Sequence, residues 1–153
     1  FKEKEHERKL NIEDAVEANI DKAYFKKLKQ GFDVENEEGV LIDNTKVTSP
    51  GPRPKSYAFC SDTAYNESII PIIENVTALY HESTFLEAHA KLASPTKHST
   101  AKQAATIAKK ARVGTLILGH YSTRYDDLEA FKQEAQAIFN DVTLADSGKV
   151  ISI

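Results

Sequence analysis

The feature that most constrains this sequence is a regular alternation of short apolar runs and helical patterns that begins at Ser56. Polar residues and then a helical pattern follow the runs 56–60, 76–80 and 115–119, and 142–145 continues the series. This alternation is typical of parallel strands joined by helices, so we expect an α/β fold with one buried sheet. Ligands gather at the carboxyl ends of the strands in such sheets, so the residues that follow each run are the first candidates for function.

Prolines set two of the expected boundaries. Pro71 lies among isoleucines and fits only the first turn of a helix, so we expect a helix that begins after Ser68. We expect Pro95 to lie in a loop. Residues 150–153 are apolar enough to close the chain as a short strand.

Capping patterns predict two further helices. Thr84 with Glu87 and Thr100 with Gln103 both match the capping box, in which the side chains of the two residues bond to each other's backbone N–H groups. The second helix has a long alanine-rich face suited to close packing on a sheet. We expect Gly114 to end it.

Residues 1–54 differ in texture from the rest of the chain. Helical spacing indicates two short helices, at 12–19 and 22–30, and a hairpin is expected at 32–42. Three prolines make residues 49–56 an extended linker. We therefore expect this part to be separate from the α/β region.

Composition narrows the class of protein. The 153 residues are 41% hydrophobic and 28% charged, which suits one globular domain, and no apolar run approaches the length of a membrane span. The single Cys60 excludes an internal disulfide and fits a reducing compartment, so cytoplasm is expected. The net charge of −3 weighs only weakly against a nucleic-acid partner. The chain contains no methionine, so we expect it to be a piece of a longer protein.

Histidines and carboxylates follow the predicted strands, as a metal site or an acid–base pair requires. They are Asp62, His81, Glu82 and His120, with His98 in a further loop. Three of them have a simpler interpretation: Asp62 as a helix cap, His81 as a core histidine, and His98 as part of a capping turn. His120 is harder to dismiss, because it ends the most apolar of the predicted strands. Asp62 and His120 alone do not complete a zinc site, which needs about four donors.

The motifs that carry these residues occur in a fixed order. They are FCSDT, YHESTF, KHSTAKQAATIAKKA, LILGHYSTRYDD and TLADSGKVISI. Together they resemble the carboxyl-terminal half of ribonuclease Z, the tRNA 3′-processing endonuclease family of the metallo-β-lactamase superfamily. The resemblance implies half of a four-layer αββα sandwich at 55–153 and an inserted helical and hairpin arm with its linker at 1–54.

The resemblance also implies roles for individual residues. Asp62 matches the carboxylate that bridges two zinc ions, and His120 matches the last histidine ligand, while most other ligands lie outside this chain. His98, oriented by Glu82, matches the histidine that protonates the leaving 3′ oxygen. The remaining two matched residues are Ser122 and Arg124, which would hold backbone phosphate near the cleavage site.

The implied activity is metal-assisted hydrolysis that removes the 3′ trailer of precursor tRNA. The resemblance also implies a homodimer that does not bind a membrane. The sequence departs from the family pattern in two ways. The half with the HxHxDH motif is missing, so this piece alone should bind metal poorly and cut nothing. Residues 11–30 also lack the glycine-proline-rich stretch that grips tRNA. Two alternatives therefore stay open: a phosphodiesterase of the same fold acting on small substrates, and a non-catalytic fragment for dimerisation or binding.

Overall fold

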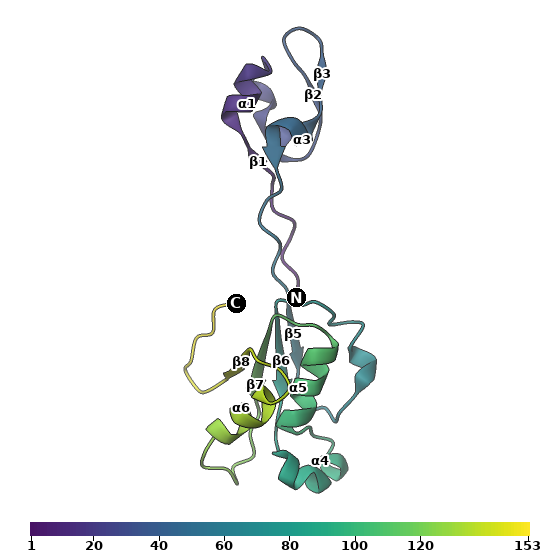
Figure 1. Cartoon of the computed structure of the whole chain (residues 1–153), viewed down its shortest axis with the longest axis vertical. Coiled ribbons are helices and arrows are strands. Elements are labelled where there is room, and N and C mark those ends of the chain that lie inside the picture. Colours follow the sequence, from purple (N-terminus) through teal and green to yellow (C-terminus); the bar gives the residue numbers. More distant parts are fainter. The chain divides into compact units, whose positions relative to one another are not determined.

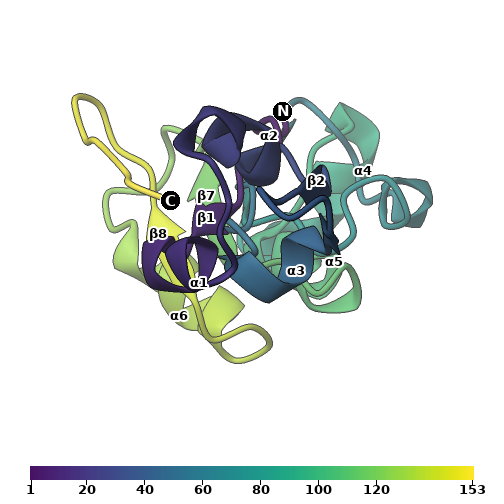
Figure 2. The same cartoon turned by 90° about the horizontal axis from the view of Figure 1, so that it is seen from above.

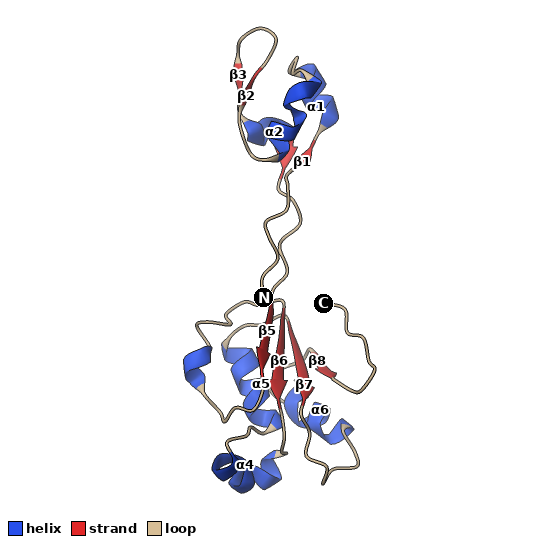
Figure 3. Ribbon diagram, turned by 180° about the vertical axis from the view of Figure 1, so that it is seen from behind, coloured by secondary structure: helices blue, strands red, loops and turns tan.

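The apolar runs of residues 56–145 form one parallel sheet in a computed structural model that describes all residues, 1–153. Its strands are β5 (Tyr57–Cys60), β6 (Ala78–Glu82), β7 (Thr115–Gly119) and β8 (Val142–Leu144), in the spatial order β5-β6-β7-β8 (Figure 1). Each neighbouring pair is parallel. The expected α/β architecture is therefore present, with all four strands ending at the same edge (Figure 3).

Two helices pack on this sheet and build the core. They are α5 (Ala101–Lys110) and α6 (Glu129–Gln136). The predicted capping box of Thr100 and Gln103 is present, and the alanine-rich face of α5 is buried as expected. Leu79, Leu116 and Leu118 meet these helices from the sheet. Because alanine has no bulky side chain, α5 can approach the strands closely.

The other face of the sheet is aromatic and more open. Tyr57, Phe59 and Tyr80 alternate along their strands with the residues that face α5 and α6. The rings of Phe59 and Tyr80 stack 4.6 Å apart between centroids, and Phe59 is 63% exposed. A sheet with helices on one face and an open apolar surface on the other fits half of a layered sandwich.

The helix expected after Ser68 is not formed. The chain makes only the short 3-10 helix η2 (Glu67–Ile69) and then turns. Pro71 has no N–H to continue a helical ladder, and Asn75 takes a left-handed backbone with a φ of 58°. This segment is therefore a connection made of turns.

The helix expected from the first capping box begins later than predicted. Thr84 does not cap it, because its hydroxyl donates to the carboxylate of Glu82 instead. The 3-10 helix η3 (Glu87–His89) leads into α4 (Ala90–Thr96), so Pro95 lies inside a helix and not in a loop. The helix ends at Thr96, one residue after Pro95, and the cap residue Lys97 takes a left-handed backbone with a φ of 59°.

Two further boundaries differ from the prediction. The helix α5 ends at Lys110, and Arg112 takes the left-handed turn with a φ of 52°. Gly114 serves close packing instead: a Cβ there would lie 2.5 Å from the carbonyl oxygen of Thr77. Residues 150–153 form no strand, and the segment after β8 is drawn as a loop (Figure 2).

Residues 3–54 form a second compact unit, and Phe1 and Lys2, which we grouped with the arm, lie with the sheet. The N–H groups and carbonyls of Phe1 and Tyr57 bond to each other at 2.8 Å, and Lys2 bridges to Ser56. Residues 3–54 therefore leave the sheet unit and return to it at adjacent positions.

All helices of the chain are too short or too polar to cross a lipid bilayer.

The second unit contains short helices and two small antiparallel pairs. Its elements are β1 (Lys9–Leu10), α1 (Ile12–Glu17), η1 (Lys22–Tyr24), α2 (Phe25–Lys29), β2 (Val34–Glu35), β3 (Leu41–Ile42), α3 (Asn44–Val47) and β4 (Thr48–Ser49). The β2–β3 hairpin and the first two helices agree with the prediction, while β1 pairs with β4. Ala15, Leu28 and Val47 are buried in its own core. The sequence analysis missed α3, although its Asp43 cap is a recognisable signal.

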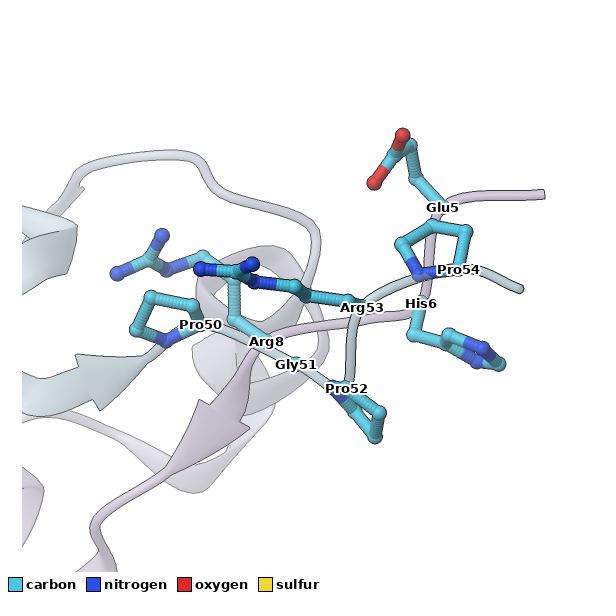
Figure 4. A pocket seen from close by; sticks show the side chains of 8 residues that line it. All are labelled: Glu5, His6, Arg8, Pro50, Gly51, Pro52, Arg53 and Pro54. Carbon is cyan, nitrogen blue, oxygen red and sulfur yellow. The ribbon is translucent and has the colours of Figure 1, made fainter. Parts of the chain in front are cut away.

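A pocket of about 330 Å³ lies where residues 5–8 and 50–54 run together. Its lining residues are Glu5, His6, Arg8, Pro50, Gly51, Pro52, Arg53 and Pro54 (Figure 4). Nε of Arg8 donates to the hydroxyl of Thr48 at 2.7 Å, which holds this guanidinium in place. Arg8 and Arg53 extend in the same direction, toward Pro50 (Figure 4). The pocket therefore presents two cationic side chains between prolines.

Candidate active site

The candidate active site lies at the carboxyl ends of β5, β6 and β7 (Figure 3). Asp62 follows β5, His120 follows β7 directly, and Glu82 is the last residue of β6 between them. His98 reaches the same place from the turn that precedes α5. We expected Glu82 in a loop, but β6 runs two residues further than predicted, and this places its carboxylate inside the protein.

Asp62, His98 and His120 come together at this edge. Nε2 of His120 lies 3.4 Å from Oδ1 of Asp62, and the centroids of the two imidazole rings are 5.2 Å apart. One ligand atom from each residue lies within 4.8 Å of the other two. Asp62 and His120 are exposed, whereas His98 is partly buried. The structure thus brings a carboxylate and two imidazoles to one open surface.

The backbone is left-handed at both candidate ligands. The φ angle is 49° at Asp62 and 59° at His120. For a residue with a Cβ this conformation costs roughly 1–2 kcal/mol, and it is concentrated at positions where function fixes the geometry. Asp62 is not a helix cap, the simpler interpretation considered for it, because no helix begins directly after it.

Glu82 is a fully buried carboxylate that accepts hydrogen bonds from four residues. Its donors are Nδ1 of His98 (2.8 Å), the N–H of Thr63 (2.7 Å), the N–H of Ser99 (3.2 Å), and the hydroxyl (2.7 Å) and N–H (3.3 Å) of Thr84. Burial by itself would raise the pKa of Glu82, but these bonds outweigh it and hold the pKa below its ordinary value. The carboxylate is therefore ionised at neutral pH.

The hydrogen bond to Glu82 fixes the form of His98. A carboxylate can only accept, so Nδ1 of His98 carries a proton and donates it toward Oε1 of Glu82. The side chain of His98 is 23% exposed. Because Glu82 holds the proton on Nδ1, Nε2 is the ring nitrogen left to exchange a proton with a substrate.

His81 takes the structural role that we considered for it. It is 1% exposed within β6, and its Nδ1 donates to the carbonyl oxygen of Glu82 at 2.8 Å. Nε2 has no hydrogen-bond partner, and burial lowers the pKa of the ring. His81 is thus a neutral core histidine that holds the end of the strand.

Ser122 and Arg124 lie in the loop after β7. The N–H of Ser122 donates to the carbonyl oxygen of Thr84 at 3.1 Å, which ties this loop to the one after β6. The guanidinium of Arg124 lies 5.8 Å from the ring centroid of Phe85, and none of its described contacts is with a carboxylate. Its charge is therefore available to an anion near the site.

The sequence analysis missed several residues that organise the site. They are Thr63, Thr84, Ser99 and Tyr125, of which Tyr125 accepts from the N–H of Leu86 and bonds to Nδ1 of His89. One signal was present: hydroxyl residues recur beside Asp62 and the histidines in SDT, HEST, HST and HYST. We interpreted Thr84 as a helix cap, whereas it bonds to the carboxylate of Glu82, as the N–H groups of Thr63 and Ser99 do.

The donors fit part of a metal centre. Nitrogen and carboxylate oxygen are zinc ligands, but three donors are fewer than the four that a closed zinc site uses. Nε2 of His120 and Oδ1 of Asp62 lie 3.4 Å apart at the surface, so both atoms can bind one cation placed between them. Asp62 and His120 are therefore the residues that would hold a metal ion.

Known proteins are similar to this chain in sequence and in fold. No protein-family model matches the chain. A ribonuclease Z from Parabacteroides distasonis is 51% identical over 126 residues, which are 82% of this chain and 41% of that protein. One from Cytophaga hutchinsonii is 46% identical over 149 residues, which are 97% of this chain and 47% of that protein. The predicted resemblance to the carboxyl-terminal half of ribonuclease Z is confirmed.

The chain thus spans less than half the length of these ribonuclease Z relatives. Solved structures agree on the fold. The metallo-β-lactamase fold protein YhfI from Bacillus subtilis aligns with a TM-score of 0.58 and 28% identity, covering 67% of this chain and 44% of that one. A long form RNase Z from yeast aligns with a TM-score of 0.54 and 26% identity, covering 60% and 12%. The sheet unit is part of a metallo-β-lactamase sandwich, as expected.

Proposed function

We propose that this chain is the carboxyl-terminal part of a metal-dependent endoribonuclease that removes the 3′ trailer of precursor tRNA. The observation that carries the proposal is the meeting of Asp62, His120 and the His98–Glu82 pair at one sheet edge, in a chain 51% identical to a ribonuclease Z. Zinc is the metal we propose, with two ions in the complete site and most ligands outside this chain. A cytoplasmic homodimer is the form that the resemblance implies.

In this proposal each residue has one task. Asp62 and His120 would hold metal, which when bound polarises the phosphodiester and activates water. His98 keeps its Nδ1 proton on Glu82 and would transfer a second proton, from Nε2, to the 3′ oxygen as the P–O bond breaks. Arg124, whose described contacts include no carboxylate, would pair with a backbone phosphate. Ser122 would donate a hydrogen bond from its hydroxyl to the phosphate backbone of the RNA.

We propose that residues 3–54 bind the tRNA. Two features of this unit support an RNA backbone as the ligand. Lys26, Lys27 and Lys29 are exposed on α2, and Arg8 and Arg53 line the pocket of Figure 4. Lysine and arginine clusters bind phosphates with little regard to sequence. Replacing the three lysines of α2 by alanine should raise KM for tRNA and leave turnover of a small ester unchanged.

The test uses the full-length protein encoded by the intact gene. It should cleave a precursor tRNA with a 3′ trailer and release the mature 3′ end, and His120→Ala should abolish this. Bis(p-nitrophenyl) phosphate serves as a small diester in parallel. Ester turnover without tRNA cleavage would replace our proposal with a phosphodiesterase for small substrates. Absence of both activities in a metal-loaded, folded protein would favour a binding fragment.

A further inference from the structure

The buried Glu82 carboxylate reaches both histidines of the site, and it reaches His120 through a third side chain. Nδ1 of His98 bonds to it directly at 2.8 Å. The hydroxyl oxygen of Thr84 lies 2.7 Å from Oε2 of Glu82 and 2.9 Å from Nδ1 of His120. Thr84 is 8% exposed, so water does not compete freely for these bonds.

The direction of both bonds follows from the number of protons available. The hydroxyl of Thr84 has one hydrogen, and the ionised carboxylate of Glu82 can only accept, so the hydroxyl donates to Glu82. The same oxygen must then accept from His120, which places a proton on Nδ1 of that ring. With Nδ1 protonated, Nε2 is the ring atom left to bind a ligand, and it faces Asp62 at 3.4 Å.

Backbone bonds hold the two ends of this contact together. The N–H of Ser83 donates to the carbonyl oxygen of Gly119 at 2.8 Å, just before His120. The N–H of Ser122 donates to the carbonyl oxygen of Thr84 at 3.1 Å, just after it. The side-chain bond between Thr84 and His120 is therefore flanked on both sides, and its geometry is fixed by the loops.

We propose that Thr84 is a positioning residue that holds His120 in its Nδ1–H form, so that one carboxylate, Glu82, orients both the metal ligand and the proton donor. Ligating histidines are oriented in this way by a hydrogen-bonded partner on the second ring nitrogen. The metal-binding and proton-donor roles rest on the proposed function, whereas the hydrogen-bond relay is a property of this chain. A purely structural Thr84 would leave the tautomer of His120 and its affinity for metal unchanged.

The tautomer is measured by ¹H–¹⁵N correlation of the histidine rings in the full-length protein stripped of metal, with His120 assigned by His120→Gln. We expect the proton on Nδ1 in the wild type and in Thr84→Ser, which keeps the hydroxyl. Thr84→Val has nearly the same shape without the hydroxyl, and it should give a mixture of both tautomers. An Nε2–H form in the wild type, or an unchanged Nδ1–H form in Thr84→Val, would overturn the proposal.

Metal affinity of the full-length protein gives the second readout, with zinc and a competing chelator. Thr84→Val should weaken binding about 10–100-fold, as other losses of such partners do, and Thr84→Ser should recover most of it. Thr106→Val, at a partly exposed position of α5, is the matched control and should bind as the wild type does. If the full-length protein binds zinc but cleaves no tRNA, the proposed function fails while the relay still stands on the ring tautomer. Equal affinities for Thr84→Val and the wild type would count against the relay itself.

Discussion

Asp62 and His120 follow strands that are not neighbours, yet Oδ1 of Asp62 lies 3.4 Å from Nε2 of His120. The strand β6 lies between them and ends in Glu82, below the surface. Left-handed backbones at Asp62 and His120 accompany this close approach across the intervening strand. The site is thus an exposed pair of ligands above a buried charge.

His98→Ala in the full-length protein should slow cleavage of precursor tRNA by about 10²–10⁴-fold, the range for loss of a general acid. Metal content should stay that of the wild type, because Asp62 and His120 remain. Metal analysis and single-turnover cleavage are the measurements, with Lys109→Ala as the control. Loss of metal would instead make His98 a ligand and remove its role as proton donor.

Arg124→Ala should weaken substrate binding more than catalysis. One phosphate contact fewer should reduce the slope of log affinity against log salt by about 1 and raise KM for tRNA. The matched control is Arg112→Ala, since Arg112 pairs with Glu74 at the far end of α5. An unchanged salt slope would show that Arg124 touches no phosphate.

His81 should make the chain less stable in mild acid. Burial lowers the pKa of His81 in the folded state, so below about pH 6.5 the unfolded chain binds a proton that the folded chain does not. Stability should therefore fall as pH decreases from about 6.5 toward the folded pKa, by up to about 1.4 kcal/mol per pH unit. Urea unfolding of the wild type and His81→Gln at several pH values measures this. The variant should show a shallower dependence, and equal slopes would contradict the assignment.

Thr100→Ala should destabilise the sheet unit by about 1 kcal/mol, because it removes the cap of α5. The same change at Thr106, partly exposed in the middle of this helix, should cost less than about 0.5 kcal/mol. Chemical denaturation of both variants is the measurement. Equal losses at the two positions would mean that the capping box contributes nothing beyond the hydroxyl itself.

His120→Gly should be more stable than His120→Ala by about 1 kcal/mol, although both lose the ligand. Alanine must keep its Cβ at a φ of 59°, whereas glycine adopts this angle freely. The same pair of changes at Lys109, in the helical part of α5, should give the opposite order by about 1 kcal/mol. Thermal unfolding of the four variants decides the matter. If His120→Ala proves at least as stable as His120→Gly, backbone strain at this position is excluded.

The parts of the fold that depend on local pattern were predictable from the sequence. The four strands, the cap of α5 and the hairpin all follow from periodicity or capping within a few residues. The failures at Pro71 and Pro95 have a common reason. A proline in the sequence marks a position where one backbone hydrogen bond of a helix cannot form. Whether a helix forms around that position depends on the elements that pack against it.

The candidate site also has a part that the sequence predicts and a part that it does not. Asp62, His98 and His120 could be singled out because they follow strands or precede a helix. The hydrogen bonds around Glu82 could not be predicted. The N–H groups of Thr63 and Ser99 meet its carboxylate only after the two loops that carry them have folded over β6. These loops are also joined by a bond from the Ser99 hydroxyl to the carbonyl oxygen of Thr63, although the two residues are 36 positions apart in the sequence. Long-range convergence of this kind leaves no periodic trace in a sequence.

The pairing of Phe1 with Tyr57 makes the chain modular. Residues 3–54 begin and end beside each other at the amino end of β5, while Asp62 lies beyond its carboxyl end. A graft of another arm, or a short loop in its place, would therefore enter and leave at the same two positions without moving the register of the sheet. Arms of different lengths could be exchanged on one sheet unit, so the ligands that the arm contacts could change while the residues of the candidate site stay in place.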